Sequence, residues 1–151
     1  RWAVNCFAAL FAVYGVGLGI SAFMGGVNPL APWTIQAKEL NFITVSSPAD
    51  LDAVMARDTD KPVLIYFTAD WCVPCKEMEL VTFQNEQVRQ RLRNFLLVKV
   101  DLTKDTAGER ALMARYKVIG PPALIIVDVG HKTVSDPVVG FVSPEKLLAL
   151  L

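Results

Sequence analysis

The N-terminal part of the sequence has almost no charge. After Arg1 the next charged residue is Lys38, although the 151 residues include 15 basic and 15 acidic side chains. Because the formal net charge is zero, no excess of either sign indicates binding to nucleic acid or to anionic lipid. Hydrophobic residues make up 53% of the chain, which excludes intrinsic disorder, since so much apolar surface must be buried.

Cysteine is also scarce, and three cysteines are too few for a small domain held together by disulfides. The remaining charges lie from Lys38 onward, in roughly 115 residues, which is enough for one domain to fold around its own core. Because the chain begins with Arg1 rather than Met, we expect a processed product or a part of a longer protein.

The uncharged segment is long enough to cross a membrane. Trp2–Met24 would form a helix of about 34 Å at ~1.5 Å per residue, against a hydrocarbon core of ~30 Å. We therefore predict a transmembrane helix over residues 1–24, followed by a linker over residues 25–40 that contains helix-breaking Gly and Pro. A secretory signal peptide usually has a shorter apolar core, and a buried helix of a soluble protein rarely stays uncharged so long.

Residues 41–151 alternate between strand-like and helical patterns. This order predicts an α/β fold, a mixed sheet flanked by helices and closed by an antiparallel hairpin. In the stretch that follows Cys72 we expect Leu80, Val88 and Leu92 to point inward. The expected strands are Phe42–Val45, Pro62–Thr68, Phe95–Val100, Ala123–Asp128 and Val138–Val142, and the expected helices run from Ser47 to Arg57, from Cys72 to about Arg93, over Ala107–Tyr116 and from Ser143 to the end.

A C-x-x-C motif, Cys72 to Cys75, stands where a buried strand meets a helix. The thiolate is the reactive form of cysteine, and the first turn of a helix offers free N–H groups and a positive dipole end that stabilise an anion. We expect Cys72 to be exposed at that end and Cys75 to lie one turn further in. The spacing lets the two sulfurs meet, which predicts a redox-active pair.

Two other interpretations of this pair are weaker. A structural zinc site normally has four ligands, and only Cys6 and His131 remain to complete one. A purely structural disulfide is the other possibility. We predict no metal, and no cofactor besides the redox-active pair itself.

Further candidate residues lie around the motif. Glu79 follows Cys75 by four residues and therefore shares its helix face, so it is either a proton acceptor for Cys75 or a solvated surface residue. Trp71 either shields the sulfurs or simply packs. Pro121-Pro122 is either an ordinary turn or one that contains a cis peptide bond.

The segment Phe67–Lys76 resembles the redox motif of the thioredoxin superfamily. Ile119–Ala123 is similar to the cis-proline loop of that superfamily, with Pro122 in the cis position, and Val139–Phe141 is similar to its last-strand glycine motif. The resemblance implies a thioredoxin-like fold over residues 41–151. It also implies that Trp71 and Pro122 belong to the groove that binds the partner protein.

Three short segments, Ala69–Cys72, Lys76–Glu79 and Val81–Phe83, also resemble the C-terminal domain of the thiol:disulfide interchange protein DsbD family. In that family the last helix of a membrane domain leads into a periplasmic thioredoxin-like domain. The resemblance implies a protein-disulfide reductase that takes electrons from the membrane domain and passes them to periplasmic disulfide proteins. By the same resemblance, Cys72 attacks and Cys75 resolves.

The DsbD resemblance carries further expectations and one departure. It implies that the protein lies in a bacterial inner membrane, with its thioredoxin-like domain in the periplasm, and that Glu79 tunes the cysteine pair. Members of the family often have a buried Asp six residues before the first cysteine, where this sequence has Tyr66. A tyrosine, with an ordinary pKa of ~10, is a poor base near neutral pH, so proton transfer would depend more on Glu79 or on water.

Two other functions remain open at this point. One is a singly anchored thioredoxin-like protein of cytochrome c maturation, against which the absence of an initial Met counts. The other is a soft-metal-binding or chaperone module that uses Cys72 and Cys75 as ligands. The direction of electron flow is also open, since ~30 mV is equivalent to ~1.4 kcal/mol in a two-electron couple, and small changes near the sulfurs can reverse the preference.

Overall fold

The computed structural model describes residues 7, 11–16, 40–57, 60–130 and 136–151. The chain divides into two compact units, Arg1–Lys38 and Glu39–Leu151. In the first unit, residues 11–16 are helical, and most of the predicted membrane helix and nearly all of the predicted linker lie outside the described residues. None of the helices described is both long enough and apolar enough to span a bilayer. The membrane helix therefore stays a prediction.

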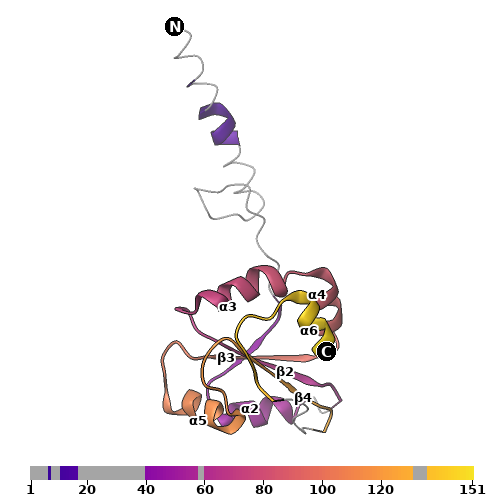
Figure 1. Cartoon of the computed structure of the whole chain (residues 1–151). Helices are drawn as coiled ribbons and strands as arrows, with labels where there is room; N and C mark the ends of the chain where they lie inside the picture. Colours follow the sequence, from indigo (N-terminus) through magenta and orange to yellow (C-terminus); the bar gives the residue numbers. More distant parts are fainter. Residues whose placement is uncertain (1–6, 8–10, 17–39, 58–59, 131–135) are drawn as a thin grey trace. The chain divides into compact units, whose positions relative to one another are not determined.

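The second unit is built on a mixed five-stranded sheet with the strand order β1-β3-β2-β4-β5 (Figure 1). The strands β1, β3 and β2 run parallel, whereas β4 is antiparallel to β2 and β5 is antiparallel to β4. The predicted mixed sheet and its closing antiparallel pair are thereby confirmed. The strands are β1 (Ile43–Val45), β2 (Val63–Thr68), β3 (Leu96–Asp101), β4 (Ala123–Val127) and β5 (Val138–Val139).

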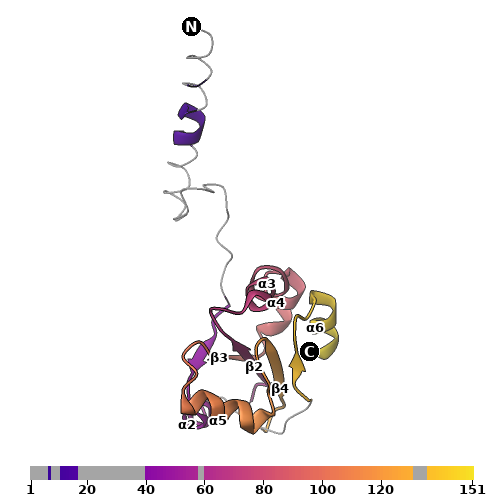
Figure 2. The ribbon, with the colours of Figure 1, turned by 60° about the vertical axis from the view of Figure 1, so that its left-hand side comes forward.

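Helices cover both faces of the sheet, as Figures 1 and 2 show from two directions. The helices α2 (Pro48–Met55) and α5 (Ala107–Tyr116) lie on one face, and α3 (Val73–Glu77), α4 (Glu86–Leu92) and α6 (Pro144–Leu150) lie on the other. Every residue of β2 and β4 is therefore buried, which explains why both strands are continuous apolar runs.

Side-chain caps fix where several helices begin. Thr106 and Glu109 form a reciprocal capping box at the start of α5. Ser143, the predicted N-cap of the last helix, accepts a hydrogen bond from the N–H of Lys146, and Ser47 caps α2 in the same way. These local signals are short in sequence, which is why these helix starts could be predicted.

The stretch after the C-x-x-C motif differs from the single helix that we predicted. It consists of α3, a π-helical turn η1 (Met78–Thr82) and α4, which starts anew because the side chain of Asn85 accepts two backbone N–H groups. Val88 and Leu92 are buried as expected, but Leu80 is 66% exposed. Leu80 lies two residues from buried Met78 and two from buried Thr82, which places it on the opposite side of the turn.

The return strand of the final hairpin, β5, is shorter than the predicted strand Val138–Val142. Gly140 has φ of 95°, a conformation that favours glycine, and it follows directly after the two residues of β5. Its N–H donates to the carbonyl oxygen of Pro122 at 2.8 Å. Most of the predicted hairpin loop, including His131, lies outside the described residues.

Candidate redox site

The two cysteines of the motif are joined as a disulfide at the start of α3. Cys72 is the N-cap of α3, and its Cα atom lies 5.3 Å from that of Cys75. The predicted meeting of the two sulfurs is confirmed. The pair stands just beyond the carboxyl end of β2, a central strand of the sheet, with a short loop of Ala69, Asp70 and Trp71 between.

Backbone donors converge on Cys72. The N–H of Cys75 lies 3.2 Å from Cys72 Sγ, and the N–H groups of Cys75 and Lys76 lie 3.2 Å and 3.3 Å from the Cys72 carbonyl oxygen. A sulfur that already faces an N–H donor in the disulfide is placed to be stabilised as a thiolate once the bond is reduced. The geometry thus supplies what the chemistry of an attacking cysteine requires.

The burial of Cys72 differs from the prediction. Only 4% of this residue is exposed and Cys75 is fully buried, whereas we expected Cys72 to be exposed. Its sulfur is bonded to the buried Cys75 and is thereby drawn inward. Its neighbours Trp71 and Val73 are instead well exposed, at 64% and 78%. An incoming disulfide would therefore meet apolar side chains on either side of Cys72 in the sequence.

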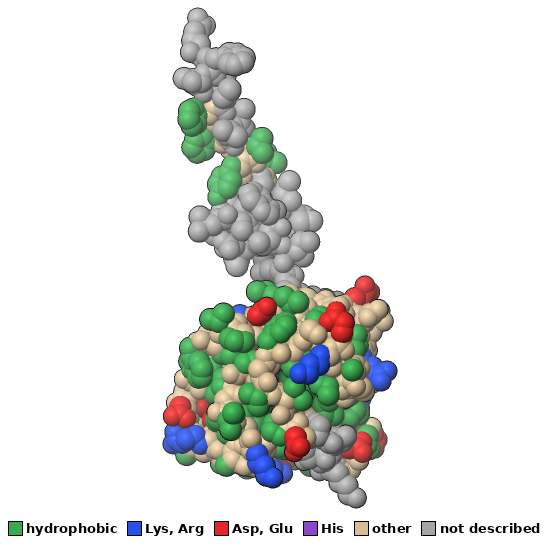
Figure 3. Space-filling model, viewed as in Figure 1, with side chains coloured by type: hydrophobic (Ala, Val, Ile, Leu, Met, Phe, Trp, Pro, Cys, Tyr) green, Lys and Arg blue, Asp and Glu red, His purple; other side chains and the backbone are tan. Residues whose placement is uncertain are grey.

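The proline loop lies beside the strand that carries the motif. The bond between Pro121 and Pro122 is cis, as the resemblance implied. Ala123 pairs with Phe67 across the antiparallel β2–β4 ladder, which brings Pro122 next to the end of β2. Ile119, just before this loop, is 86% exposed. It is one of several hydrophobic residues on the surface of the domain, and Figure 3 shows the hydrophobic side chains on one face.

Glu79 lies in η1, with about a third of its side chain exposed. Its Oε2 atom is 3.5 Å from Nζ of Lys76. In the part of the chain that the structure describes, the Glu79 carboxylate thus pairs with a lysine and makes no hydrogen bond to either sulfur. Its role in proton transfer is a proposal, which we take up below.

Tyr66 contacts the redox pair in a way that the sequence did not indicate. Its hydroxyl donates a hydrogen bond of 3.2 Å to the carbonyl oxygen of Cys75, and the residue is 1% exposed. Its ring meets those of Phe42 and Phe83 with centroids 5.9 Å and 5.1 Å away. Burial raises the pKa of Tyr66 to about 12, so the phenol stays protonated at neutral pH.

Thr68 lies two residues after Tyr66, on the same face of β2. Its hydroxyl is close enough to the phenol to favour the ionised form of Tyr66, but the two groups do not have hydrogen-bond geometry. Thr68 Oγ1 is buried and has no hydrogen-bond partner within the ranges described. These two buried groups on the same face of β2 are therefore both neutral hydroxyls.

A second group missed by the sequence analysis holds the loop before Cys72. The N–H of Asp70 donates to Oγ1 of Thr103 at 2.9 Å, and Thr103 in turn donates its N–H and its hydroxyl to the carboxylate of Asp101. Burial opposes charge on Asp101, but these hydrogen bonds, together with the charges of Lys99 and Lys76, outweigh it and lower the pKa of the carboxyl. The end of β3 thus fixes the loop that follows β2.

Within the described ranges no cluster of three or more His, Cys, Asp or Glu residues could hold a metal ion. The sulfur atoms of Cys72 and Cys75 are bonded to each other in the disulfide. The arrangement fits thiol–disulfide exchange, in which the sulfur atoms themselves carry the electrons.

Residues 46–129 match the family model described as thioredoxin-like, which covers the C-x-x-C motif and the proline loop. The chain belongs to the thioredoxin-like family. The thioredoxin-like fold predicted from the sequence is thereby confirmed.

Within this family the chain is similar to DsbD proteins. It is 38% identical over 146 residues to the thiol:disulfide interchange protein DsbD of Ralstonia nicotianae, which covers 89% of this chain and 24% of that protein. It is 32% identical over 137 residues to DsbD of Yersinia pestis, covering 85% of this chain and 23% of that protein. The chain therefore spans about a quarter of the length of the curated relatives it matches, and the resemblance to the DsbD family is confirmed.

Solved structures agree with this placement. The oxidised C-terminal domain of DsbD from Neisseria meningitidis matches with a TM-score of 0.60 and 32% identity, covering 72% of this chain and 96% of that domain. A thioredoxin from Thermus thermophilus, at 22% identity and a TM-score of 0.57, supports the fold alone.

Proposed function

We propose that the chain is a protein-disulfide reductase module that passes electrons by thiol–disulfide exchange. One observation carries the proposal above the others: Cys72 caps α3 and its Sγ faces the N–H of Cys75 at 3.2 Å. A backbone donor at this place lowers the energy of the thiolate that attacks a partner disulfide. The similarity to DsbD proteins supports the same reaction class.

The proposed reaction begins with both cysteines reduced. The Cys72 thiolate attacks one sulfur of the partner disulfide; the partner's S–S bond breaks, and its leaving sulfur takes up a proton as a thiol. Cys75, after losing its proton, attacks Cys72 Sγ and releases the second partner sulfur. The partner has gained two electrons, and the module ends with the Cys72–Cys75 disulfide seen in the structure.

The second step needs an acceptor for the proton of Cys75. Tyr66 does not serve, because burial keeps its phenol protonated far above neutral pH. Glu79, one helical turn beyond Cys75 and partly exposed, is the carboxylate that we assign to this task, in exchange with solvent. Trp71 and Pro122 would border the groove that receives the partner chain.

The electron donor that we propose is a membrane domain, and the acceptors are periplasmic disulfide proteins. The similarity to the C-terminal part of DsbD supports this placement, as does the apolar character of residues 1–24 in the sequence. In this proposal the protein is held in a bacterial inner membrane and its thioredoxin-like domain faces the periplasm.

Trapping the mixed disulfide tests the proposal. The Cys75→Ser variant retains the attacking sulfur but cannot resolve, so with insulin as the disulfide partner we expect it to accumulate a covalent adduct through Cys72. The matched control is Cys72→Ser, which should give none. If Cys75→Ser forms no adduct and the wild-type protein does not reduce insulin, the proposal is wrong.

The direction of electron flow requires a separate measurement. Equilibration with glutathione gives the reduction potential of the pair, and a reductase should be well below the roughly −120 mV of a strong oxidant. A value near that of the strong oxidants would leave thiol–disulfide exchange in place but overturn the role as a reductase.

A further inference from the structure

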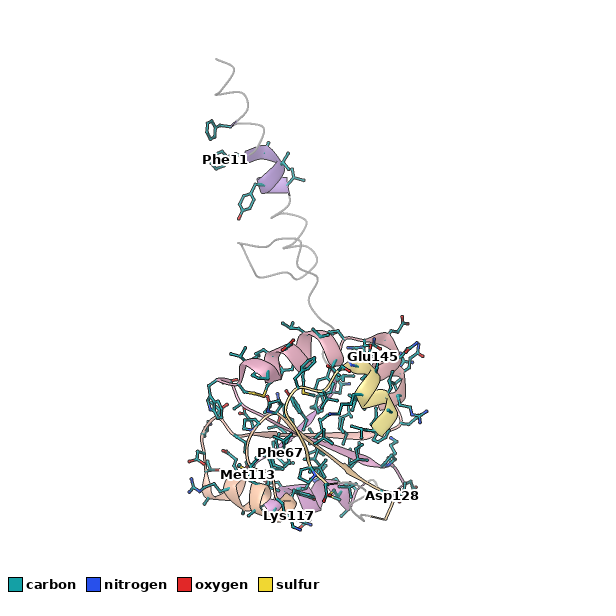
Figure 4. All side chains as sticks on the ribbon, viewed as in Figure 1. Phe11, Phe67, Met113, Lys117, Asp128 and Glu145 are labelled. Atoms are coloured by element: carbon teal, nitrogen blue, oxygen red, sulfur yellow. A yellow bond between two sulfur atoms is a disulfide. The ribbon has the colours of Figure 1, made fainter. Side chains whose placement is uncertain are left out.

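Tyr66 belongs to β2, and its side chain contacts the redox pair from the side of the sheet. Its neighbour Phe67 points to the opposite face of the sheet, where its ring lies 6.4 Å from that of Tyr116 in α5. Figure 4 labels Phe67 on β2 and Met113, which belongs to α5 as Tyr116 does. Side chains alternate along a strand, so Tyr66 points toward α3. Its hydroxyl meets the carbonyl oxygen of Cys75 at 3.2 Å.

The carbonyl that Tyr66 binds belongs to the same peptide unit as the N–H of Lys76. That N–H donates to the carbonyl oxygen of Cys72 at 3.3 Å. A hydrogen bond to one end of a peptide unit polarises it and strengthens the bond made by the other end. A continuous path thus runs from the phenol, through one peptide unit, to the backbone of Cys72.

Few hydrogen bonds hold the first turn of α3, so a change in one of them has a large effect on its geometry. The helix has five residues, and its backbone N–H donors to Cys72 come from Cys75 and Lys76. The same N–H of Cys75 faces Cys72 Sγ. The N–H of Cys75 belongs to the preceding peptide unit, which is joined to the 75–76 unit at the Cα atom of Cys75. A shift of the Cys75 carbonyl therefore moves the Lys76 N–H directly and the Cys75 N–H through that shared atom.

We propose that Tyr66 is a positioning residue for the redox pair: by holding the Cys75 carbonyl it aligns the backbone donors around Cys72 and so stabilises the reduced form. This inference rests on the proposed function, since it concerns the same two sulfurs. Tyr66 exchanges no proton with either cysteine. It acts through the peptide unit between residues 75 and 76.

The charged surroundings of the phenol are limited. Glu79, from η1, is the charged side chain that acts on it through space. Lys99 is its register partner on β3, with the neutral Leu124 on β4 at its other side. Replacing Tyr66 with Phe keeps all three, together with the packing against the Phe42 and Phe83 rings, and removes only the hydroxyl.

The test compares Tyr66→Phe with Tyr116→Phe, which removes the same atom from a half-buried tyrosine on the other face of the sheet. For Tyr66→Phe we expect the equilibrium constant for oxidation by glutathione disulfide to rise about two- to tenfold, the range that one hydrogen bond supplies. The Cys72 thiol should also titrate at higher pH, followed by thiolate absorbance. Tyr116→Phe should leave both unchanged.

A merely structural role gives a different result. If the hydroxyl stabilised the fold alike in both redox states, unfolding would become easier by the same amount in each, and the equilibrium with glutathione would not move. That outcome overturns the inference. Urea unfolding of oxidised and reduced Tyr66→Phe provides the second measurement, and we expect the larger loss in the reduced form.

Failure of this inference is separable from failure of the proposed function. An unchanged equilibrium in Tyr66→Phe, with wild-type protein that still reduces insulin, rejects only the role of Tyr66. Wild-type protein that reduces no disulfide, with no adduct in Cys75→Ser, rejects the function itself.

Discussion

Cys72 and Cys75 are three residues apart in the sequence, yet their surroundings differ. Cys72 ends an extended segment and receives backbone donors, whereas Cys75 lies inside the first turn, fully buried above Tyr66. The difference follows from the strand-to-helix junction, and it supports the proposed roles, in which the first sulfur attacks and the second resolves. The motif made this difference predictable.

Tyr66 should govern the alkaline stability of the domain. Its ordinary pKa is 10.0 and burial raises it to about 12 in the folded state. Between these values the unfolded chain loses a proton that the folded one retains, so the stabilisation is complete below pH ~10 and is lost as the pH rises to ~12. Tyr66→Phe should show a smaller loss in this interval, measured by urea unfolding at successive pH values. Equal losses in variant and wild type would contradict the assignment.

The hydrogen bond of Tyr66 was beyond sequence reasoning for a physical reason. Its acceptor is a backbone carbonyl, which carries no sequence signal, and the contact depends on how closely α3 packs over β2. In the sequence, Tyr66 stands out only as a non-acidic residue six positions before Cys72. It could not give the partner.

At the scale of elements, η1 connects α3, the helix that contains Cys75, to the C-terminal helix α6. The hydroxyl of Thr82, which is fully buried, donates to the carbonyl oxygen of Val142 at 2.6 Å. Val142 lies just before α6, and α6 packs against both η1 and α4. This one bond therefore holds the C-terminal helix against the segment that follows the cysteines.

Replacing Thr82 with Val should destabilise the domain by about 1–3 kcal/mol, because the buried carbonyl of Val142 loses this donor. The exposed Thr44 of β1 offers a matched control, Thr44→Val, which should change stability little. Urea unfolding with an unchanged m-value measures both. Equal effects of the two substitutions would show that the buried bond contributes nothing of its own.

The loop before Cys72 should respond to acid through Asp101. Its pKa is lowered in the folded state, so its contribution is present above the ordinary value of 3.8 and is lost as the pH falls through the lowered pKa. Asp101→Asn should be less stable than wild type at pH ~7, and the gap should narrow below pH ~4. Asp60→Asn, exposed near the opposite end of β2, is the control. A gap that stays constant into acid would reject the role of the Asp101 charge.

The division of the stretch after Cys72 into three elements was not predictable. Leu80, Val88 and Leu92 fit one helical period approximately, and a π-helical turn leaves no mark in composition. Asn85 was the available signal, since asparagine is a favoured N-cap. Leu80 was consequently assigned to the wrong face.

At the scale of the whole domain, three separate parts of the sequence meet at one edge of the sheet. The parallel strands β2 and β3 end there, so the cysteine motif and the Asp101–Thr103 segment lie together, and the antiparallel β4 begins there after Pro122. The alternation of strands and helices predicts the parallel pairing of β2 and β3, but it does not predict that β4 runs antiparallel to β2 and so begins at this edge. The side-chain contacts within it depend on packing and were not predictable.

The division of the chain at Lys38 leads to a last prediction. All the buried residues of the described hydrophobic core belong to the second unit, from Val45 to Leu147. A shortened protein of residues 39–151 should therefore fold, form the same disulfide and equilibrate with glutathione as the full chain does.

The full chain, expressed in bacteria, should sediment with membranes and be released by detergent rather than by high salt, because residues 1–24 are apolar and uncharged after Arg1. The shortened protein should remain in the supernatant. If high salt releases the full chain, the predicted membrane helix is wrong, whereas a shift in the redox equilibrium on shortening would mean that the first unit acts on the cysteine pair.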